Sequence, residues 1–269
     1  MKAVRLKCAL EARQILDRLR HQPEILELQL FEKDVYQPER LIRIIRMLKK
    51  KGIRVYLHHP MKFRGEFVDI LSEDRERRDF YDWSCSILTQ VCRQERVKCV
   101  VHAHYAGTEC SELDHFRLGK KLRNRIRRFA EEAGEWFLWE NTTQGMFSQE
   151  NPYFISELVK PLGLSLCLDI SHSFIAFQGD NEKLQQGLAE ALPFVEYYHV
   201  VDSLGAGHDS LSLGLGKVDW GRVIPYLTGK DFIFEIGLEN VYDCTPMIRS
   251  AEYLAQLQHQ TQTQAQAES

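Results

Sequence analysis

The sequence has no apolar run long enough to cross a bilayer, because its longest apolar segments are of strand length and a spanning helix needs about 20 residues. The N-terminal segment MKAVRLKCALEARQ also lacks the uninterrupted apolar core of a secretory leader. The seven cysteines include no CxxC pair, and their odd number argues against a disulfide framework. These absences predict a soluble, cytoplasmic protein with reduced thiols and no membrane partner.

Neither sign of charge is in large excess, since the net charge is −3. A general polyanion binder usually has a basic surplus, so nucleic acid is not favoured as a partner. The most basic segment, RLGKKLRNRIRR at 117–128, has apolar residues at helical spacing, which is typical of an amphipathic helix. The chain also lacks a linker rich in proline, glycine or serine, which predicts one domain over residues 1–258 and a disordered tail at 259–269.

Short apolar runs alternate with longer amphipathic segments along the chain. This alternation predicts parallel strands connected by helices. Eight such units fit an α/β fold with a single (β/α)8 TIM barrel better than an open doubly wound sheet, because the Rossmann phosphate loop is missing after the first strand. The predicted strands are 4–10, 24–30, 53–59, 97–104, 135–141, 164–170, 195–201 and 231–237, and the predicted helices are 11–21, 38–50, 74–94, 112–133, 152–159, 181–192, 220–227 and 246–258.

Ionisable side chains stand near the C-terminal ends of six consecutive predicted strands. In a closed barrel these ends meet at one mouth, so the side chains are expected to converge there. Taken singly, each has a structural explanation, because a strand-end histidine is usually a hydrogen-bonded core or rim residue and a carboxylate can cap the following helix. The residues are His58 and His59, His102 and His104, Glu140, Asp169, His199, and Glu235, of which His59 and His104 could equally face the helices.

The joint pattern indicates a metal site. Several carboxylates in one mouth repel one another and raise each other's pKa values, and a divalent cation removes that penalty. Mixed histidine and carboxylate ligands suit Zn²⁺, Mn²⁺ or Co²⁺. In the segment LSLCLDISHSF, the burial of Asp169 is then explained by its role as a ligand. His172 either binds a metal or the substrate, or it starts the next helix.

Five segments, in this order, resemble the xylose isomerase-like TIM barrels, a superfamily that includes endonuclease IV and many sugar isomerases and epimerases. They are WENTTQG (139–145), LCLDISHSF (166–174), YYHVVDS (197–203), SLGLGKVDW (212–220) and FIFEIG (232–237). For the isomerase and epimerase branch, the resemblance implies one metal held by Glu140, Asp169, His199 and Glu235.

The resemblance to the endonuclease IV branch implies further ligands. His58 and His102 match a second metal site there, and His172 matches a third, shared with two residues of the loop after strand seven. His208 and Ser210 stand at those two positions in AGHDSLSLGLG, and serine is a poor zinc ligand. The glycine-rich N-terminal opening typical of endonuclease IV is also missing, so this branch fits less well than the other.

Two functions fit this set of residues. The favoured one is a divalent-metal-dependent isomerase or epimerase of a sugar or sugar phosphate. In it, Glu140 and Glu235 transfer protons next to a carbonyl group and His172 hydrogen-bonds the substrate. The alternative is a metal-dependent phosphodiesterase or AP endonuclease, in which His58 and His102 hold a second metal with Glu140 as the bridge.

Further substrate contacts are expected from His58, His102 and His208. Lys62 and Arg64, in the segment PMKFRGE, could contact a phosphate group under either function. A non-catalytic metal-binding barrel is a third option, because a fold does not fix a function. The sequence leaves the substrate and the oligomeric state open.

Overall fold

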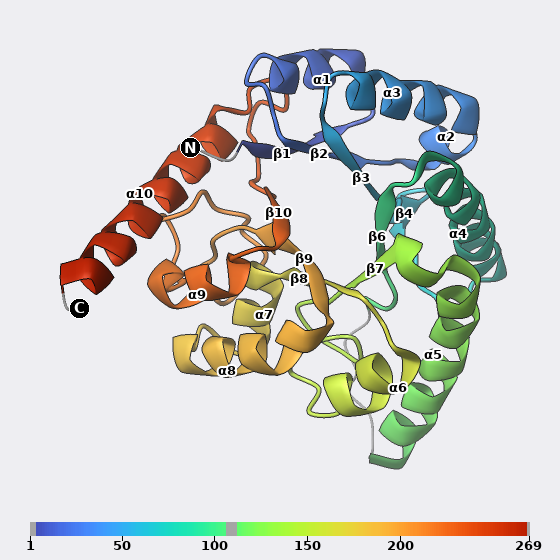
Figure 1. The fold of residues 1–269 in the computed structure, drawn as a ribbon. Helices are drawn as coiled ribbons and strands as arrows, with labels where there is room; N and C mark the ends of the chain where they lie inside the picture. The colour runs from blue at the N-terminus through green and yellow to red at the C-terminus, as the bar shows by residue number, and fades with distance from the viewer. Residues whose placement is uncertain (1–3, 106–111, 268–269) are drawn as a thin grey trace.

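Eight parallel strands close into a barrel in a computed structural model that describes residues 4–105 and 112–267 (Figure 1). The order round the barrel is β1-β10-β9-β8-β7-β6-β3-β2, so β1 closes on β10. The TIM barrel predicted from the sequence is therefore confirmed. The strands are β1 (Arg5–Ala9), β2 (Ile25–Gln29), β3 (Arg54–His58), β6 (Lys98–His102), β7 (Phe137–Glu140), β8 (Leu166–Asp169), β9 (Val195–Val200) and β10 (Asp231–Phe234).

The barrel strands are largely buried on both faces, which explains their nearly continuous apolar sequences. Tyr56 packs against the barrel's inner apolar cluster and stacks on Tyr197, with 4.2 Å between the ring centroids. This packing fills the interior, so the ionisable side chains gather above it, where the strands end. The members of the inner cluster are Ile25, Val100, Leu138, Cys167, Tyr197 and Ile233.

Helices cover the outside of the barrel (Figure 1). α3 shows why they form where the sequence predicts, since Pro38 takes the first helical turn and Leu41, Ile45 and Leu48 are buried along one stripe. The helices with predicted counterparts are α1 (Ala12–Leu19), α3 (Pro38–Lys50), α4 (Arg75–Glu95), α5 (Glu112–Ala133), a π-helix (Phe154–Val159) that continues into α6 (Lys160–Leu162), α8 (Asn181–Ala191), α9 (Trp220–Leu227) and α10 (Thr245–Ala267).

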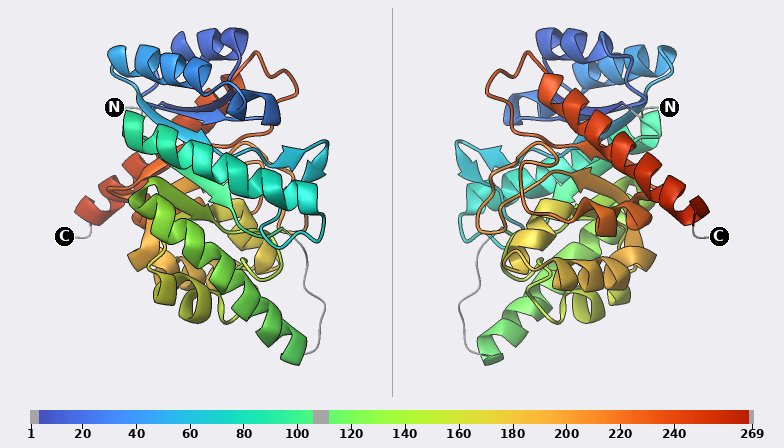
Figure 2. Two further views of the ribbon diagram at one scale, coloured as in Figure 1. Left: turned by 90° about the vertical axis from the view of Figure 1, so that its right-hand side faces the viewer. Right: turned by 90° about the vertical axis from the view of Figure 1, so that its left-hand side faces the viewer.

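Three of the short elements near the ends of strands are not predicted from the sequence, because none is long enough to show a periodicity. They are α2 (Glu32–Val35), α7 (Ile170–Ala176) and a hairpin of β4 (Lys62–Phe63) and β5 (Glu66–Phe67). The hairpin turn consists of Arg64 and Gly65, whose φ angles of 50° and 87° are both positive, as a two-residue type I′ turn requires. The hairpin projects from the side of the molecule (Figure 2).

The last helix, α10, extends to Ala267, whereas the sequence predicts a disordered tail from residue 259 on. Glutamine and alanine dominate this stretch and are good helix formers, so the helix continues without an apolar stripe. Among the described residues, no helix combines the length and the apolar character needed to span a bilayer.

Candidate metal centre

The four ligands predicted for the main metal site converge at the mouth of the barrel. Glu140 and Asp169 end β7 and β8, His199 lies in β9 directly opposite Asp169, and Glu235 follows β10. One potential ligand atom from each lies within 4.8 Å of the others. The first three side chains are almost completely buried, and Glu235 is partly exposed. The closed barrel therefore brings together residues that are far apart in the sequence.

His199 shows why this group of side chains fits a cation. Its Nε2 lies 2.9 Å from Oε2 of Glu27, and since a carboxylate can only accept, Nε2 carries the hydrogen. Nδ1 of a neutral ring then has a lone pair, yet it lies 3.1 Å from Glu140 Oε1 and 2.5 Å from Glu235 Oε2. A lone pair facing two carboxylate oxygens is repulsive unless a proton or a metal ion lies between them.

His58 repeats this arrangement on the other side of Glu140. Its Nδ1–H donates to the carbonyl oxygen of His59 at 2.9 Å, so Nε2 of the neutral ring is an acceptor. That atom lies 3.1 Å from Glu140 Oε2, and His102 Nε2 lies 2.8 Å from the same oxygen. Glu140 thus presents one oxygen to His199 and the other to His58 and His102, so a second ion, if one binds, would be held by His58 and His102 with Glu140.

Asp169 both caps a helix and faces the metal centre. Its Oδ1 accepts hydrogen bonds from the backbone N–H of His172 at 2.7 Å and from the hydroxyl of Ser171 at 2.8 Å, which starts α7. Its Oδ2 lies 4.0 Å from His199 Nδ1. The capping bonds fix the carboxylate in an orientation that leaves its second oxygen, Oδ2, available to bind a metal ion.

His172 meets His208 beside this centre. The Nδ1–H of His172 donates to the carbonyl oxygen of Asn141 at 2.7 Å, so its Nε2 is free to accept, and Nε2 of His208 lies 2.9 Å from it. The Ser210 hydroxyl lies 3.2 Å from the other ring nitrogen of His208. Two of the residues aligned with a third metal site therefore do come together, and the serine points to His208 instead of completing a ligand set.

Two residues that support the centre are missed by the sequence reasoning. Glu27 binds His199, as described above, and Lys7 Nζ lies 3.1 Å from Glu27 Oε1 and 2.5 Å from Glu235 Oε1. Lys7 and Glu27 are paired across β1 and β2 and are both buried. The signal was present in the sequence, because each is a charged residue in the middle of a strand with apolar residues on both sides of it.

The charged side chains of the site carry a net negative charge that a divalent cation would neutralise. Four carboxylates, those of Glu27, Glu140, Asp169 and Glu235, surround His199, and Lys7 is the only lysine or arginine in the described part of the chain that forms an ion pair with any of them. Burial alone lowers the pKa of Lys7, but Glu235, Glu27 and Glu140 outweigh it and raise that pKa. This surplus of negative charge, with oxygen and imidazole donors, suits Zn²⁺, Mn²⁺ or Co²⁺.

The pKa values of two histidines of the centre, His199 and His102, shift in opposite directions. Burial lowers the pKa of His199, but Cys167, Glu235 and Glu27 outweigh burial and raise it well above its ordinary value. At His102 burial prevails over Glu140, and the pKa is lowered. A positive charge is therefore favoured at the His199 position, where the carboxylates converge.

Four of the other residues considered from the sequence lie outside the metal centre. His59 binds the hydroxyl of Ser84 in α4 at 2.7 Å, and burial lowers its pKa to about 3. His104 pairs with Asp69 at 2.8 Å. Lys62 lies over the ring of Phe67, with 4.8 Å between Nζ and the centroid, and the guanidinium of Arg64 pairs with Glu76 of α4. A phosphate contact by Arg64 would require that ion pair to open.

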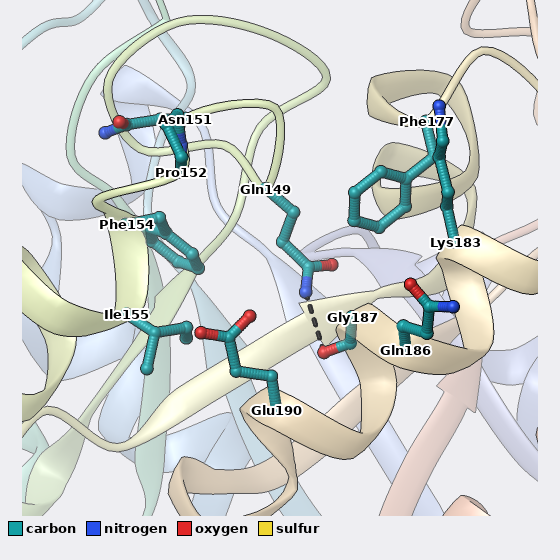
Figure 3. A pocket seen from close by; sticks show the side chains of 10 residues that line it. All are labelled: Gln149, Asn151, Pro152, Phe154, Ile155, Phe177, Lys183, Gln186, Gly187 and Glu190. Carbon is teal, nitrogen blue, oxygen red and sulfur yellow. Dashed lines mark hydrogen bonds between the residues drawn. The ribbon is translucent and has the colours of Figure 1, made fainter.

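A separate surface cavity of about 170 Å³ lies between the segment after β7 and α8 (Figure 3). Gln149 reaches into it and donates a hydrogen bond to the carbonyl oxygen of Gly187 at 2.9 Å. Phe177 and Lys183 lie on one side of Gln149, and Phe154 lies on the other. None of the candidate metal ligands lines this cavity, so it is distinct from the mouth of the barrel.

Comparison with known proteins identifies the family of this chain. The xylose isomerase-like TIM barrel family matches residues 23–259, and no protein with a curated description matches significantly. A D-tagatose 3-epimerase-like protein superposes with a TM-score of 0.76, at 14% identity over 97% of this chain and 100% of its own. A protein from Thermus thermophilus, soaked with zinc chloride, gives 0.69, at 20% identity over 96% and 98%.

D-psicose 3-epimerase from Clostridium cellulolyticum, solved with D-tagatose, gives a TM-score of 0.67 at 14% identity over 95% of this chain and 97% of its own. At such identities the superpositions show a shared fold. The family match covers most of the sequence, and the chain therefore belongs to the xylose isomerase-like TIM barrel family.

Proposed function

We propose that this protein is a divalent-metal-dependent isomerase or epimerase that acts on a sugar or sugar phosphate. The observation that carries the proposal is that two carboxylates, those of Glu140 and Glu235, both lie next to the same nitrogen of His199, Nδ1. The proposal is supported by the family and by the epimerase and the epimerase-like protein among the similar structures.

A divalent ion bound by Glu140, Asp169, His199 and Glu235 would polarise a substrate carbonyl group and acidify the neighbouring C–H bond. The two glutamates are then the groups that remove and return the proton. Lys7 holds one oxygen of Glu235, Oε1, which leaves Oε2 directed at the centre. His172 is buried at the same mouth, and its Nε2, which lies 2.9 Å from His208 Nε2, would accept a hydrogen bond from a substrate hydroxyl group if His208 moves aside.

The first prediction concerns proton exchange. Purified protein loaded with Mn²⁺, Co²⁺ or Zn²⁺ and incubated with a panel of ketoses and ketose phosphates in deuterated water is expected to incorporate deuterium next to the carbonyl of at least one of them. Proton NMR measures the loss of the C–H signal, and chelator-treated protein is the control. If no member of the panel exchanges under any of the three metals, the isomerase proposal is wrong for these substrate classes.

A metal-dependent phosphodiesterase is the second candidate, favoured by a specific set of contacts. His58 and His102 both lie against Glu140 Oε2, and His208 contacts His172. None of these four histidines is needed to hold the ion in the isomerase proposal. They would provide ligands for a second and a third ion, as the resemblance to endonuclease IV implies.

The second prediction separates these candidates by metal content. For the isomerase we expect about one tightly held ion per chain after dialysis, and for the phosphodiesterase two to three. Elemental analysis compares the metal content of the wild type with that of a His58→Ala, His102→Ala double variant. Because the isomerase proposal does not use these two histidines as ligands, the two metal contents are expected to differ little. Cleavage of a duplex that contains an abasic site, lost on Glu140→Gln, would instead establish the phosphodiesterase.

A further inference from the structure

A second group of metal-ligating side chains lies outside the barrel mouth. Asp17 and His21 come from the end of α1 and the turn that follows it, and Cys244 immediately precedes α10. One ligand atom from each lies within 4.8 Å of the others. Cys244 is fully buried, Asp17 is 9% exposed, and His21 is partly exposed. None of the three takes part in the site described above.

The protein holds the carboxylate of Asp17 in a fixed orientation. Its Oδ2 accepts hydrogen bonds from the guanidinium of Arg18 at 2.9 Å and from the backbone N–H of Cys244 at 3.1 Å. In the described part of the chain, no nitrogen or hydroxyl group donates to Oδ1, and no hydrogen bond or ion pair involves the ring of His21. One oxygen is thus anchored, and the only further partner of the carboxylate in the described part of the chain is the thiol of Cys244, whose proton a metal ion would replace.

These three residues lie at the seam of the barrel. β1 and β10 meet there with a single registered pair, Leu6 and Phe234, whereas β1 and β2 share five. The segment between β10 and α10 runs beside α1 (Figure 1), and the Arg18 guanidinium donates to the carbonyl oxygen of Val241 at 2.7 Å. A link at this seam joins residues near the two ends of the chain and so closes a very long loop. Closing a loop of this length costs conformational entropy, which a bound ligand shared by both ends would offset.

We propose that Asp17, His21 and Cys244 form a structural metal site that joins the first and last helices of the barrel. The ligands are a carboxylate, an imidazole and a thiol, with a water molecule as the fourth. This set suits a tetrahedral Zn²⁺ or Co²⁺ ion and not Mg²⁺ or Ca²⁺, which prefer oxygen. Burial and Asp17 raise the pKa of the Cys244 thiol to about 12, so the ion displaces a proton when it binds.

The third prediction uses Co²⁺ as a probe that reports this site alone. The candidate ligands in the barrel mouth are nitrogen and oxygen atoms, so a thiolate-to-cobalt charge-transfer band in the near ultraviolet arises only where a cysteine binds. Titration of the metal-free wild type is expected to produce this band with about one equivalent of bound Co²⁺. Cys244→Ser is expected to abolish the band, and His21→Gln to weaken cobalt binding at this site about tenfold or more.

Two buried cysteines of α4 serve as matched controls, since Cys85→Ser and Cys92→Ser should both keep the band. Zinc at one hundred times its Kd should also raise the midpoint of thermal unfolding by roughly 5 °C more in the wild type than in Cys244→Ser. A band that is absent from the wild type, or that persists in Cys244→Ser, overturns the proposal. If Cys244→Ser does not fold, His21→Gln decides by the same criteria, because an unchanged cobalt titration excludes the site.

Discussion

Replacement of Glu140 by glutamine is expected to reduce turnover by about a thousandfold or more. Glu140 contacts His58, His102 and His199 at distances of 2.8 to 3.1 Å, so its negative charge acts on all three histidines of the centre. Glutamine keeps the length of the side chain but can neither accept the substrate's proton nor neutralise a cation. The measurement is kcat on whichever ketose the exchange panel identifies, together with the metal content of the purified variant.

A matched control distinguishes this effect from a general loss of charge. Glu239 lies on the exposed segment four residues beyond Glu235, and Glu239→Gln should leave kcat within a factor of about two. Metal content separates the two roles of Glu140: retained metal with lost turnover indicates proton transfer, and lost metal indicates a ligand. A Glu140→Gln variant that retains both metal and turnover would remove Glu140 from the proposed mechanism.

The barrel itself could be predicted because its signals are local. Each strand is an apolar run bounded by turns, each major helix has an apolar stripe, and the strict alternation of the two leaves few topologies. Asp169, His199 and Glu140 could be predicted for a related reason, since a polar residue at the end of an apolar strand interrupts an otherwise regular pattern. Closure of the barrel then brings these strand ends together.

The remaining parts of the site depend on information that one sequence does not display. Glu27 and Lys7 lie within strands, and only the register that pairs them and the position of His199 show that they share one network. α7 exists because Asp169 caps it, yet its seven residues are too few to show a period. Arg64 could be expected at a phosphate from its charge, whereas its ion pair with Glu76 depends on how the hairpin folds against α4.

Replacement of Lys7 by methionine is expected to lower the free energy of unfolding of the metal-free protein by about 3 kcal/mol. Lys7 is the buried cation between Glu27 and Glu235, and methionine fills a similar volume without a charge. Removal of one partner leaves the carboxylates buried and uncompensated, which costs more than the ion pair itself contributes. Equilibrium urea unfolding of the metal-free wild type and variant measures the difference.

A double-mutant cycle tests this explanation. If the cost arises from uncompensated charge, Glu27→Gln in the Lys7→Met background should restore part of the lost stability, although Glu27→Gln alone is destabilising. A bound divalent ion should also reduce the cost, because it neutralises the same carboxylates. Lys33→Met, at an exposed lysine, is the matched control and should change stability by no more than about 0.5 kcal/mol. Equal effects of the Lys7 and Lys33 variants would mean that Lys7 does not balance the carboxylates, and the charge argument for the cation would then lose its support.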